Sequence, residues 1–221
     1  MPFMLRTLPE KVAPEHTALL VVDVQADFCA ADGAFGRLGR DLTAIDAMMQ
    51  PLTRLVESAR NADVSVIFLR FAQTRATESE VYREQRDRGR AGFRYCQEGT
   101  PGVEFYHLAP QLDEAVVTKH RYSGFVNTDL DLILRSNRIR TLVMTGVATN
   151  GCVDSTARDG FMHDYYVVFV EDGTATYWPE QHEATLKTVR DSYGVVAGSD
   201  ELIAIWSDAS GIIPQEREWS A

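Results

Sequence analysis

The sequence predicts an α/β protein with a Rossmann-like, three-layer α/β/α fold built on a mostly parallel sheet of about six strands. Short runs of the chain are apolar at every position, which is typical of strands buried on both faces of a parallel sheet. These runs alternate with segments whose apolar residues recur at helical spacing. Such alternation is typical of helices that cover both faces of the sheet.

The expected strands and helices follow one another along the chain. Apolar runs predict strands at 17–24, 64–71, 114–119, 141–147 and 165–172, with a short last strand within 194–199. Helical spacing predicts helices at 42–62, at 128–138, over roughly 150–163, and at 179–193. Pro51 lies inside the first of these helices, where a proline should kink or shorten it.

A turn-rich stretch, residues 25–41, follows the first expected strand. Its glycines, Gly33, Gly36 and Gly39, do not form the G-x-G-x-x-G pattern of a dinucleotide site. No helix is expected to begin directly on them. We therefore expect a loop here rather than a phosphate site.

No repeat or low-complexity linker divides the chain, so we expect one domain over residues 1–221. Its irregular part is 72–113, which contains the charged run TESEVYREQRDRGR at 77–90. Such a run is typical of an exposed helix with ion pairs. A lid over a site, or a contact between subunits, is the alternative interpretation.

The charge of the chain excludes some partners. The 221 residues include 32 acidic and 22 basic ones, for a net charge of -10, and no Lys/Arg-rich run is present. We therefore expect neither nucleic acid nor an anionic membrane as a partner. No apolar run is long enough to span a bilayer, and the first 16 residues lack the apolar run of a secretory signal. With only three cysteines, we expect free thiols and a cytoplasmic protein.

Three residues that can carry chemistry stand at or just beyond the ends of expected strands. Asp23 ends the first strand, Lys119 ends the third, and Cys152 follows the fourth. In open parallel sheets, ligands bind beyond the carboxyl ends of the strands. If these strands are neighbours, the carboxylate, the ammonium and the thiol converge. Taken singly, such residues are more often a turn residue, a solvated lysine and an inert buried cysteine.

The position of Cys152 favours a reactive thiol. Thr149 and Asn150 are good N-cap types, so Cys152 should lie in the first turn of the helix that follows. Unpaired backbone N–H groups and the helix dipole would stabilise a thiolate there, and Lys119 would add to the effect. The same N–H groups could bind an oxyanion.

Asp23, Lys119 and Cys152 lie in longer stretches of recognisable sequence. These stretches, and two that follow them, are ALLVVDVQADF (18–28), VVTKHRYSGFVNTDLDLILRSNRIRTLVMTGVATNGCV (116–153), STARDGF (155–161) and VVFVEDGTAT (167–176). In these stretches the chain resembles the isochorismatase-like cysteine hydrolase family. The resemblance covers most of the chain, is weakest over 72–113, and is greatest to the ureidoacrylate amidohydrolases. It implies a homo-oligomer, commonly a dimer or tetramer.

The resemblance also implies roles for particular residues. Cys152 corresponds to the nucleophile, Asp23 to the general base, and Lys119 to the cation that holds both. A non-proline cis peptide would join Val147 to Ala148, and the backbone N–H groups of Ala148 and Cys152 would form an oxyanion hole. Many relatives carry a larger residue where this chain has Gly151, which would widen the floor of the site.

These roles predict a hydrolase that cleaves a C–N bond of a small ureido, carbamoyl or amide compound, without a metal or other cofactor. The zinc-binding relatives carry an Asp-x-His motif where this chain reads RFAQT (70–74), and its five histidines show no ligand spacing. Candidate substrate-contacting residues are Phe28, Gln73, Tyr122 and Phe125. Gln73 would hydrogen-bond a ureido or carboxamide group, unless it lies in a solvated loop.

Other functions stay open at this stage. Biuret, nicotinamide or maleamate-like compounds are alternative substrates. A non-catalytic binding protein on the same fold is a second class of function, since a fold does not fix a function. A redox sensor that uses Cys152 is a third, although no resolving cysteine is evident in the sequence.

Overall fold

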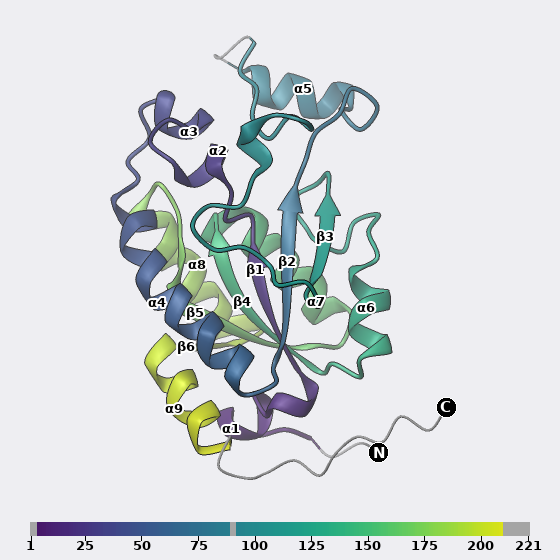
Figure 1. Ribbon diagram of the computed structural model, residues 1–221, viewed down its shortest axis with the longest axis vertical. Coiled ribbons are helices and arrows are strands. Elements are labelled where there is room, and N and C mark those ends of the chain that lie inside the picture. The colour runs from purple at the N-terminus through teal and green to yellow at the C-terminus, as the bar shows by residue number, and fades with distance from the viewer. Residues whose placement is uncertain (1–3, 89–91, 210–221) are drawn as a thin grey trace.

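The computed structural model describes residues 4–88 and 92–209, and in it six strands form one sheet with every pairing parallel (Figure 1). The order across the sheet is β3-β2-β1-β4-β5-β6. The strands are β1 (Thr17–Val22), β2 (Ser65–Phe71), β3 (Ala115–Lys119), β4 (Thr141–Val147), β5 (Tyr166–Ala175) and β6 (Val195–Ala197). The predicted three-layer α/β/α fold is therefore confirmed.

The described helices connect and flank these strands. They are α1 (Leu8–Lys11), α2 (Ala26–Cys29), α3 (Ala34–Arg37), α4 (Thr43–Asn61), α5 (Glu80–Asp87), α6 (Leu130–Ser136), α7 (Asp154–Met162), α8 (Pro179–Ser192) and α9 (Ser199–Ala209). Two 3-10 turns, η1 (Pro14–His16) and η2 (Pro101–Val103), and one π-helical turn, η3 (Thr149–Val153), complete them. Within these residues, none of the helices combines the length and the apolar composition needed to cross a bilayer.

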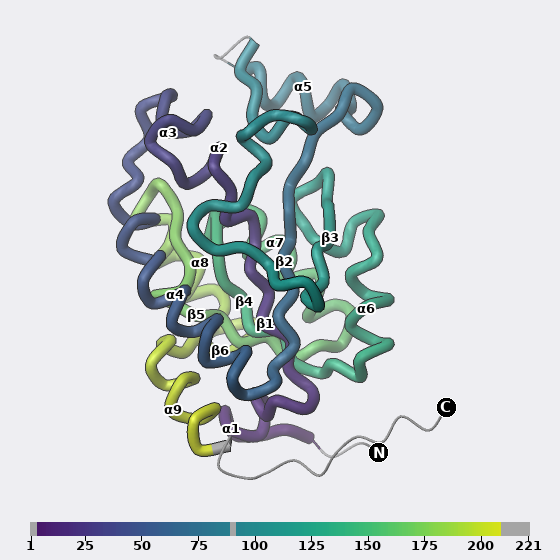
Figure 2. The backbone as a smooth tube through the Cα atoms, in the orientation of Figure 1, coloured from purple at the N-terminus to yellow at the C-terminus, as the bar shows by residue number. Residues whose placement is uncertain are grey.

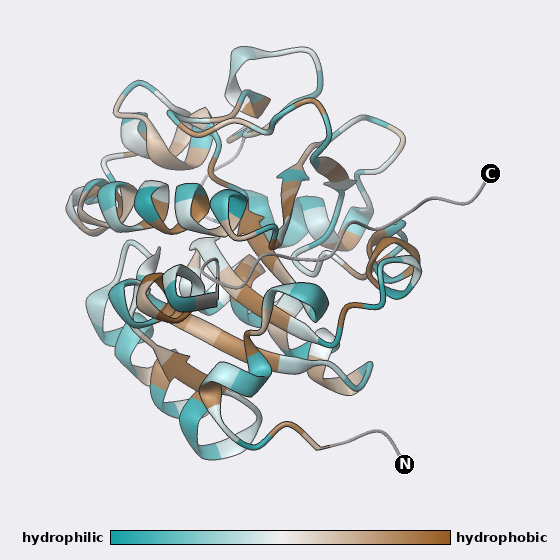
Figure 3. Cartoon of the chain, turned by 60° about the horizontal axis from the view of Figure 1, so that its bottom comes forward, coloured by the Kyte–Doolittle hydropathy of each residue, from teal (hydrophilic) through white to brown (hydrophobic). Residues whose placement is uncertain are grey.

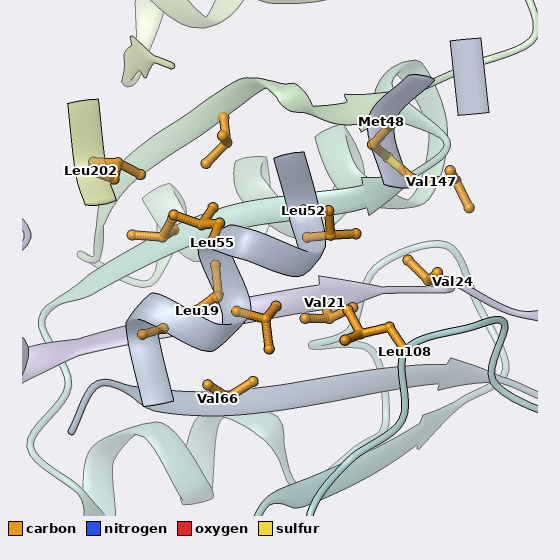
Figure 4. Packing of buried hydrophobic residues seen from close by; sticks show 14 of the residues in the cluster. Leu19, Val21, Val24, Met48, Leu52, Leu55, Val66, Leu108, Val147 and Leu202 are labelled. Carbon is orange, nitrogen blue, oxygen red and sulfur yellow. The ribbon is translucent and has the colours of Figure 1, made fainter. Parts of the chain in front are cut away.

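Each face of the sheet has its own apolar core, because successive side chains of a strand point to opposite faces. On β1, Leu19 and Val21 join a cluster with α4 and α9, which Figure 4 shows around Leu52 and Leu55. Ala18, Leu20 and Val22 join a second cluster with α6, α7 and α8. Strands buried on both faces are apolar throughout, as the mainly hydrophobic colour of the sheet in Figure 3 illustrates.

Several details differ from the sequence-based expectations. Helix α4 runs unbroken through Pro51, so the predicted shortening is wrong: apolar residues on both sides of the proline pack in the first core and hold the helix together. Strand β5 continues to Ala175, three residues beyond its predicted end. The turn-rich stretch after β1 contains two single-turn helices, α2 and α3.

Figure 2 shows that the first part of segment 72–113, which contains α5, lies beyond the end of the sheet toward which β2 and β3 run, and that its last part returns across the sheet to the start of β3. Phe105 and Leu108 in this returning part pack in the same core as α4. One isolated antiparallel bridge, between Gln25 and Phe105, joins the segment to the turn after β1. Its charged run forms α5, as expected, but Arg86 is buried rather than solvated. Residues 89–91 of this segment, and residues 1–3 and 210–221 of the predicted domain, lie outside the described part.

Candidate active site

The three chemistry-bearing residues lie at the point where the order of the strands reverses. The chain proceeds from β1 through β2 to β3 on one side and from β4 through β5 to β6 on the other. Asp23 follows β1, Lys119 ends β3, and Cys152 lies in η3 directly after β4. A crevice beyond the carboxyl ends of the strands at such a reversal is the usual ligand site in open α/β sheets.

Lys119 reaches Asp23 although β2 separates their strands. Its partner in the register of β2 is Phe71, and its Nζ lies 4.9 Å from the centroid of the Phe71 ring. Nζ donates a hydrogen bond to Asp23 Oδ2 at 2.6 Å and another to the Arg121 carbonyl oxygen at 3.2 Å. The two side chains of the ion pair are 0% and 1% exposed, so water does not screen the attraction between them.

The turn after β1 aims Asp23 into this position. Asp23 has a φ of 52°, in the left-handed region that aspartate tolerates better than most residues. On the neighbouring strand, Gly146 has a φ of 97°, and a β-carbon there would lie 2.1 Å from the Val22 carbonyl oxygen. The strand ends of β1 and β4 can therefore approach closely only because residue 146 is glycine.

The thiol of Cys152 interacts with both members of the ion pair. Burial and the Asp23 carboxylate raise the pKa of the Cys152 thiol, while Lys119 opposes them. Burial likewise raises the pKa of Asp23. Burial opposes the positive charge of Lys119, but Asp23 and Cys152 together raise its pKa. Lys119 alone among these influences favours loss of the Cys152 proton.

One oxygen of Asp23 is suited to take that proton. Asp23 Oδ2 accepts the hydrogen bond from Lys119, whereas Oδ1 is buried and makes no hydrogen bond of standard geometry within the described ranges. The Cys152 thiol is the proton donor beside this carboxylate. Proton transfer from sulfur to Oδ1 would leave the thiolate next to the Lys119 ammonium.

The loop that carries Cys152 is fixed differently from the expectation, because Thr149 and Asn150 do not cap a helix. Thr149 Oγ1 is 2.9 Å from His182 Nδ1. Asn150 accepts a hydrogen bond from Thr176 Oγ1 at 2.7 Å and donates one to Gln181. These contacts attach the loop to the residues around the start of α8.

The backbone of the same loop has two special features. The peptide bond between Val147 and Ala148 is cis, as the family resemblance implied. Gly151 departs from helical backbone angles inside η3. A β-carbon on Gly151 would meet only the Ala148 β-carbon, at 3.8 Å, so the floor of the site has room at this position.

A cavity of about 390 Å³ opens onto Cys152. Its walls are mostly aromatic, with polar and cationic residues among them. The lining residues are Phe28, Phe35, Arg40, Phe71, Gln85, Arg86, Arg88, Phe93, Tyr95, Tyr122, Ala148, Asn150, Gly151, Cys152, Tyr177 and Trp178. An apolar pocket with a few convergent polar groups is the usual form of a small-molecule site.

The structure brings two of the four candidate substrate-contacting residues to this cavity. Phe28 and Tyr122 lie in its walls. Gln73 lies outside them; it is buried rather than in a solvated loop, and its Nε2 has no hydrogen-bond partner in the part of the chain described. Phe125 also lies outside, where it stacks on His163 at 5.0 Å and packs against the second core.

Sequence reasoning missed residues that shape the site. Gln25 is fully buried two residues after Asp23, and its amide donates to the carbonyl oxygens of Phe71 and Val103, each at 2.9 Å. Its Oε1 accepts from the Phe71 N–H at 2.8 Å, so this one side chain joins the turn after β1 to the end of β2. The only feature of the sequence that could have marked Gln25 as a site residue is its position in the turn after β1. Arg40 and Arg86 were missed as well, because nothing local marks them as cavity residues.

The other two cysteines are buried and free. Burial raises the pKa of Cys29 to about 12 and that of Cys96 well above its ordinary value. Across residues 4–88 and 92–209, no three histidine, cysteine, aspartate or glutamate residues are grouped so that they could hold a metal ion.

Comparisons with known proteins agree with this geometry. Residues 17–201 match the model of the isochorismatase domain. The chain is 34% identical to ureidoacrylate amidohydrolase RutB of Stutzerimonas stutzeri, over 90% of this chain and 87% of that protein. A cysteine hydrolase from Pseudomonas syringae pv. phaseolicola superimposes with a TM-score of 0.79 at 30% identity, covering 95% of this chain and all of the other. N-carbamoylsarcosine amidase from Thermoplasma acidophilum gives a TM-score of 0.66 at 27% identity, covering 84% and 97%.

Proposed function

The chain belongs to the isochorismatase family, and we propose that it is a cysteine-dependent amidohydrolase that acts on a small ureido, carbamoyl or amide compound. It would cleave non-peptide C–N bonds, and a ureidoacrylate-like compound is the candidate substrate that the similarity to RutB suggests. The observation that carries the proposal is the buried Lys119–Asp23 ion pair beside the Cys152 thiol, at the floor of an apolar cavity.

The first half of the proposed reaction forms a covalent intermediate. Asp23 Oδ1 takes the thiol proton, and the Cys152 sulfur attacks the carbonyl carbon of the substrate. The electron pair of the carbonyl moves to its oxygen, and the backbone N–H groups of Ala148 and Cys152 stabilise the oxyanion. The C–N bond then breaks, the nitrogen takes the proton from Asp23, and the amine or ammonia leaves. A thioester, or a thiocarbamate from a ureido substrate, remains on sulfur.

The second half returns the enzyme to its starting state. Asp23 takes a proton from water, and the resulting hydroxide attacks the same carbonyl carbon. The C–S bond breaks, the acid leaves, and the sulfur regains its proton from Asp23. Lys119 keeps its charge throughout, since Asp23 and Cys152 hold its pKa above the ordinary 10.5, and it stabilises whichever partner is anionic.

Other parts of the proposal concern the surroundings of this centre. Phe28 and Tyr122 would contact the substrate from the cavity walls. We also propose a single domain and a homo-oligomer in which part of 72–113 covers the site or meets another subunit. Light scattering of the purified protein tests the assembly, and a monomeric mass would contradict it.

The decisive experiment is ammonia release from a panel of ureidoacrylate, N-carbamoyl amino acids, biuret, nicotinamide and maleamate. The Cys152→Ala variant runs beside the wild type, and we expect it to lose about 10⁴-fold or more in rate. Cys29→Ala is the matched control, because that cysteine lies outside the cavity and should leave the rate unchanged. Turnover retained by Cys152→Ala would refute the proposed nucleophile.

A further inference from the structure

Three arginines line the same cavity as Cys152 and have no part in the proposed proton transfers. Arg88 is exposed and paired with Glu84. The other two are Arg40, in the loop after α3, and Arg86, in α5. Arg40 Nε and Arg86 Nη2 are both buried, and neither has a hydrogen-bond partner among the residues described. Unpartnered buried N–H donors are rare in folded proteins and call for an explanation, which a bound ligand can supply.

Arg86 is held rigidly with one nitrogen left over. Its side chain is 2% exposed, Nη1 donates to Glu78, and Nε donates to Asp87 at 3.0 Å. These two carboxylates fix the plane of the guanidinium and balance its charge. Nη2 therefore remains an unpaired donor on a side chain that lines the cavity, although Arg86 adds little net positive charge there.

Arg40 supplies the net positive charge that Arg86, which is paired with two carboxylates, does not. Its guanidinium carbon lies 4.6 Å from the centroid of the Trp178 ring, another cavity residue. No carboxylate pairs with Arg40 across residues 4–88 and 92–209. The charge of Arg40 is thus free to attract an anion. Its contact with the Trp178 ring orients the guanidinium and leaves the N–H groups, which lie in the plane of the guanidinium, to act as donors.

Aromatic rings connect the part of the cavity beside Arg40 to the reaction centre. The series starts at Phe71, under the Lys119 ammonium, and each ring lies within 5.7 Å of the next. Its members in order are Phe71, Tyr95, Phe35, Tyr177 and Trp178, and all five line the cavity. A planar apolar body would bind well between these rings, because aromatic surfaces favour stacked and edge-to-face contacts.

The size of the cavity agrees with a substrate of this shape. Its volume of about 390 Å³ lies in the range of pockets that take drug-sized ligands, which is more than a three-carbon ureido acid fills. We propose that the substrate is an aromatic amido or ureido acid whose carboxylate binds Arg40 and Arg86 while its carbonyl meets Cys152. This inference rests on the proposed function and names its substrate class.

A binding experiment tests the anion site without requiring turnover. The probes are 3-phenylpropionate and 3-phenylpropanol, which share an aromatic body and differ in the carboxylate. Calorimetry with the full chain should show the acid binding at least about tenfold more tightly than the alcohol, and added salt should reduce that difference. Equal affinity of the two probes would overturn the proposal.

Variants assign the preference to the two arginines. Arg40→Gln should reduce the preference for the acid about tenfold and leave the affinity for the alcohol within about twofold. Arg86→Lys keeps a charge that can pair with Glu78, removes the Nη2 donor, and should weaken acid binding about threefold or more. Arg83→Gln is the control, because Arg83 is exposed on the same helix and outside the cavity. An unchanged preference in Arg40→Gln would refute the assignment.

Hydrolysis measurements separate this inference from the proposed function. The substrates are N-carbamoyl-phenylalanine and its methyl ester, and Arg40→Gln should raise KM for the acid without changing kcat. Binding of 3-phenylpropionate that depends on Arg40, together with no hydrolysis of any ureido, carbamoyl or amide compound, would refute the proposed function and leave the anion site standing. Hydrolysis of the acid and the ester with equal kcat/KM would support the proposed function and refute the anion site.

Discussion

The two ends of strand β3 each carry a cation–carboxylate pair, and the pairs behave in opposite ways. At the carboxyl end, Lys119 pairs with Asp23, whose pKa is raised by burial despite the ammonium beside it. At the amino end, Glu114 pairs with Arg60; burial opposes the charge of Glu114, but hydrogen bonds from Arg60 and the Gln111 N–H lower its pKa overall.

Burial and hydrogen bonding together explain the difference. The side chain of Asp23 is 1% exposed and that of Glu114 is 9% exposed, and burial is the largest influence on the pKa of Asp23. Both oxygens of Glu114 accept from Arg60, at 2.7 and 2.8 Å, and Oε2 also accepts from the Gln111 N–H at 2.7 Å. Asp23 Oδ2 accepts from Lys119, whereas Oδ1 makes no hydrogen bond of standard geometry among the described residues. A carboxylate with both oxygens hydrogen-bonded is held in its charged form, whereas one with an open oxygen in a dry site can accept a proton.

The comparison shows how an ion pair that stabilises the fold differs from one that can take part in proton transfer. Arg60 and Glu114 fix the end of α4 to the start of β3, with every partner satisfied and with side chains 19% and 9% exposed. Lys119 and Asp23 are fully dry and incompletely bonded, and a thiol lies beside them. Perturbed groups in a cleft with an open proton site are typical of catalysis.

The strongest test removes the ion pair between Lys119 and Asp23. Lys119→Met should lower the free energy of unfolding by about 3–5 kcal/mol, because it leaves Asp23 buried without a partner. Asp23→Leu combined with Lys119→Met should recover most of that stability, since an apolar pair needs no charge compensation. Urea unfolding measures both, and both variants should be inactive. A double variant no more stable than Lys119→Met would contradict the comparison.

Breaking the structural pair should have a smaller effect and a different signature. Glu114→Gln should cost about 1–3 kcal/mol of unfolding free energy, since Arg60 loses its charged acceptor. The rate of hydrolysis should stay within about twofold of the wild type, because Glu114 is at the far end of β3 from Cys152. A large loss of kcat in a folded Glu114→Gln protein would show that the two ends of the strand are not independent.

The two carboxylates should control the pH dependence of different properties, Glu114 that of stability and Asp23 that of activity. The pKa of Glu114 is lowered below its ordinary 4.5 on folding, so its stabilisation is complete above that value and disappears as pH falls through the folded pKa. Glu114→Gln should therefore flatten the acid side of the stability profile. Urea midpoints of the wild type and the variant, taken from about pH 3 to about pH 7, measure this.

Asp23 should set the acid limb of activity. Its pKa is raised above the ordinary 3.8, and a protonated carboxyl cannot accept the thiol proton, so kcat/KM should fall as pH drops through the raised value. Lys119, with its pKa above 10.5, adds no alkaline limb at neutral pH. An acid limb at or below 3.8 would remove Asp23 as the base.

The smallest expected effect concerns the support of the nucleophile loop. Burial lowers the pKa of His182, so the ring is neutral near pH 7, and it bonds Thr149. His182→Ala should cost about 0.5–1.5 kcal/mol of stability and lower kcat severalfold by loosening the loop that carries Cys152. His163→Ala is the control, since that ring stacks on Phe125 outside the cavity. Equal kcat in the two variants would argue against a role for His182.

Most of the fold could be predicted from the sequence because its signal is local. Strand β4 has the predicted bounds, and strands such as β2 and β3 differ by one residue from theirs, since a doubly buried strand must be apolar at every position. The prediction that Pro51 shortens α4 was wrong, because the local effect of a proline does not include the apolar contacts that hold the helix on both sides of it. The stretch around α3 was missed because a single helical turn has no periodicity to detect.

The sequence by itself determined the sheet, the two apolar cores, and the residue types that stand beyond the strand ends. Only the tertiary structure decided that Lys119 crosses β2 to reach Asp23, and that burial and Asp23 raise the pKa of the Cys152 thiol. It alone brought Arg40 and Arg86 to the cavity and left Phe125 outside it. The physical reason is the distance along the chain over which each property is set. Periodicity follows from neighbouring residues, whereas burial, pKa and the cavity walls depend on residues far apart in the sequence.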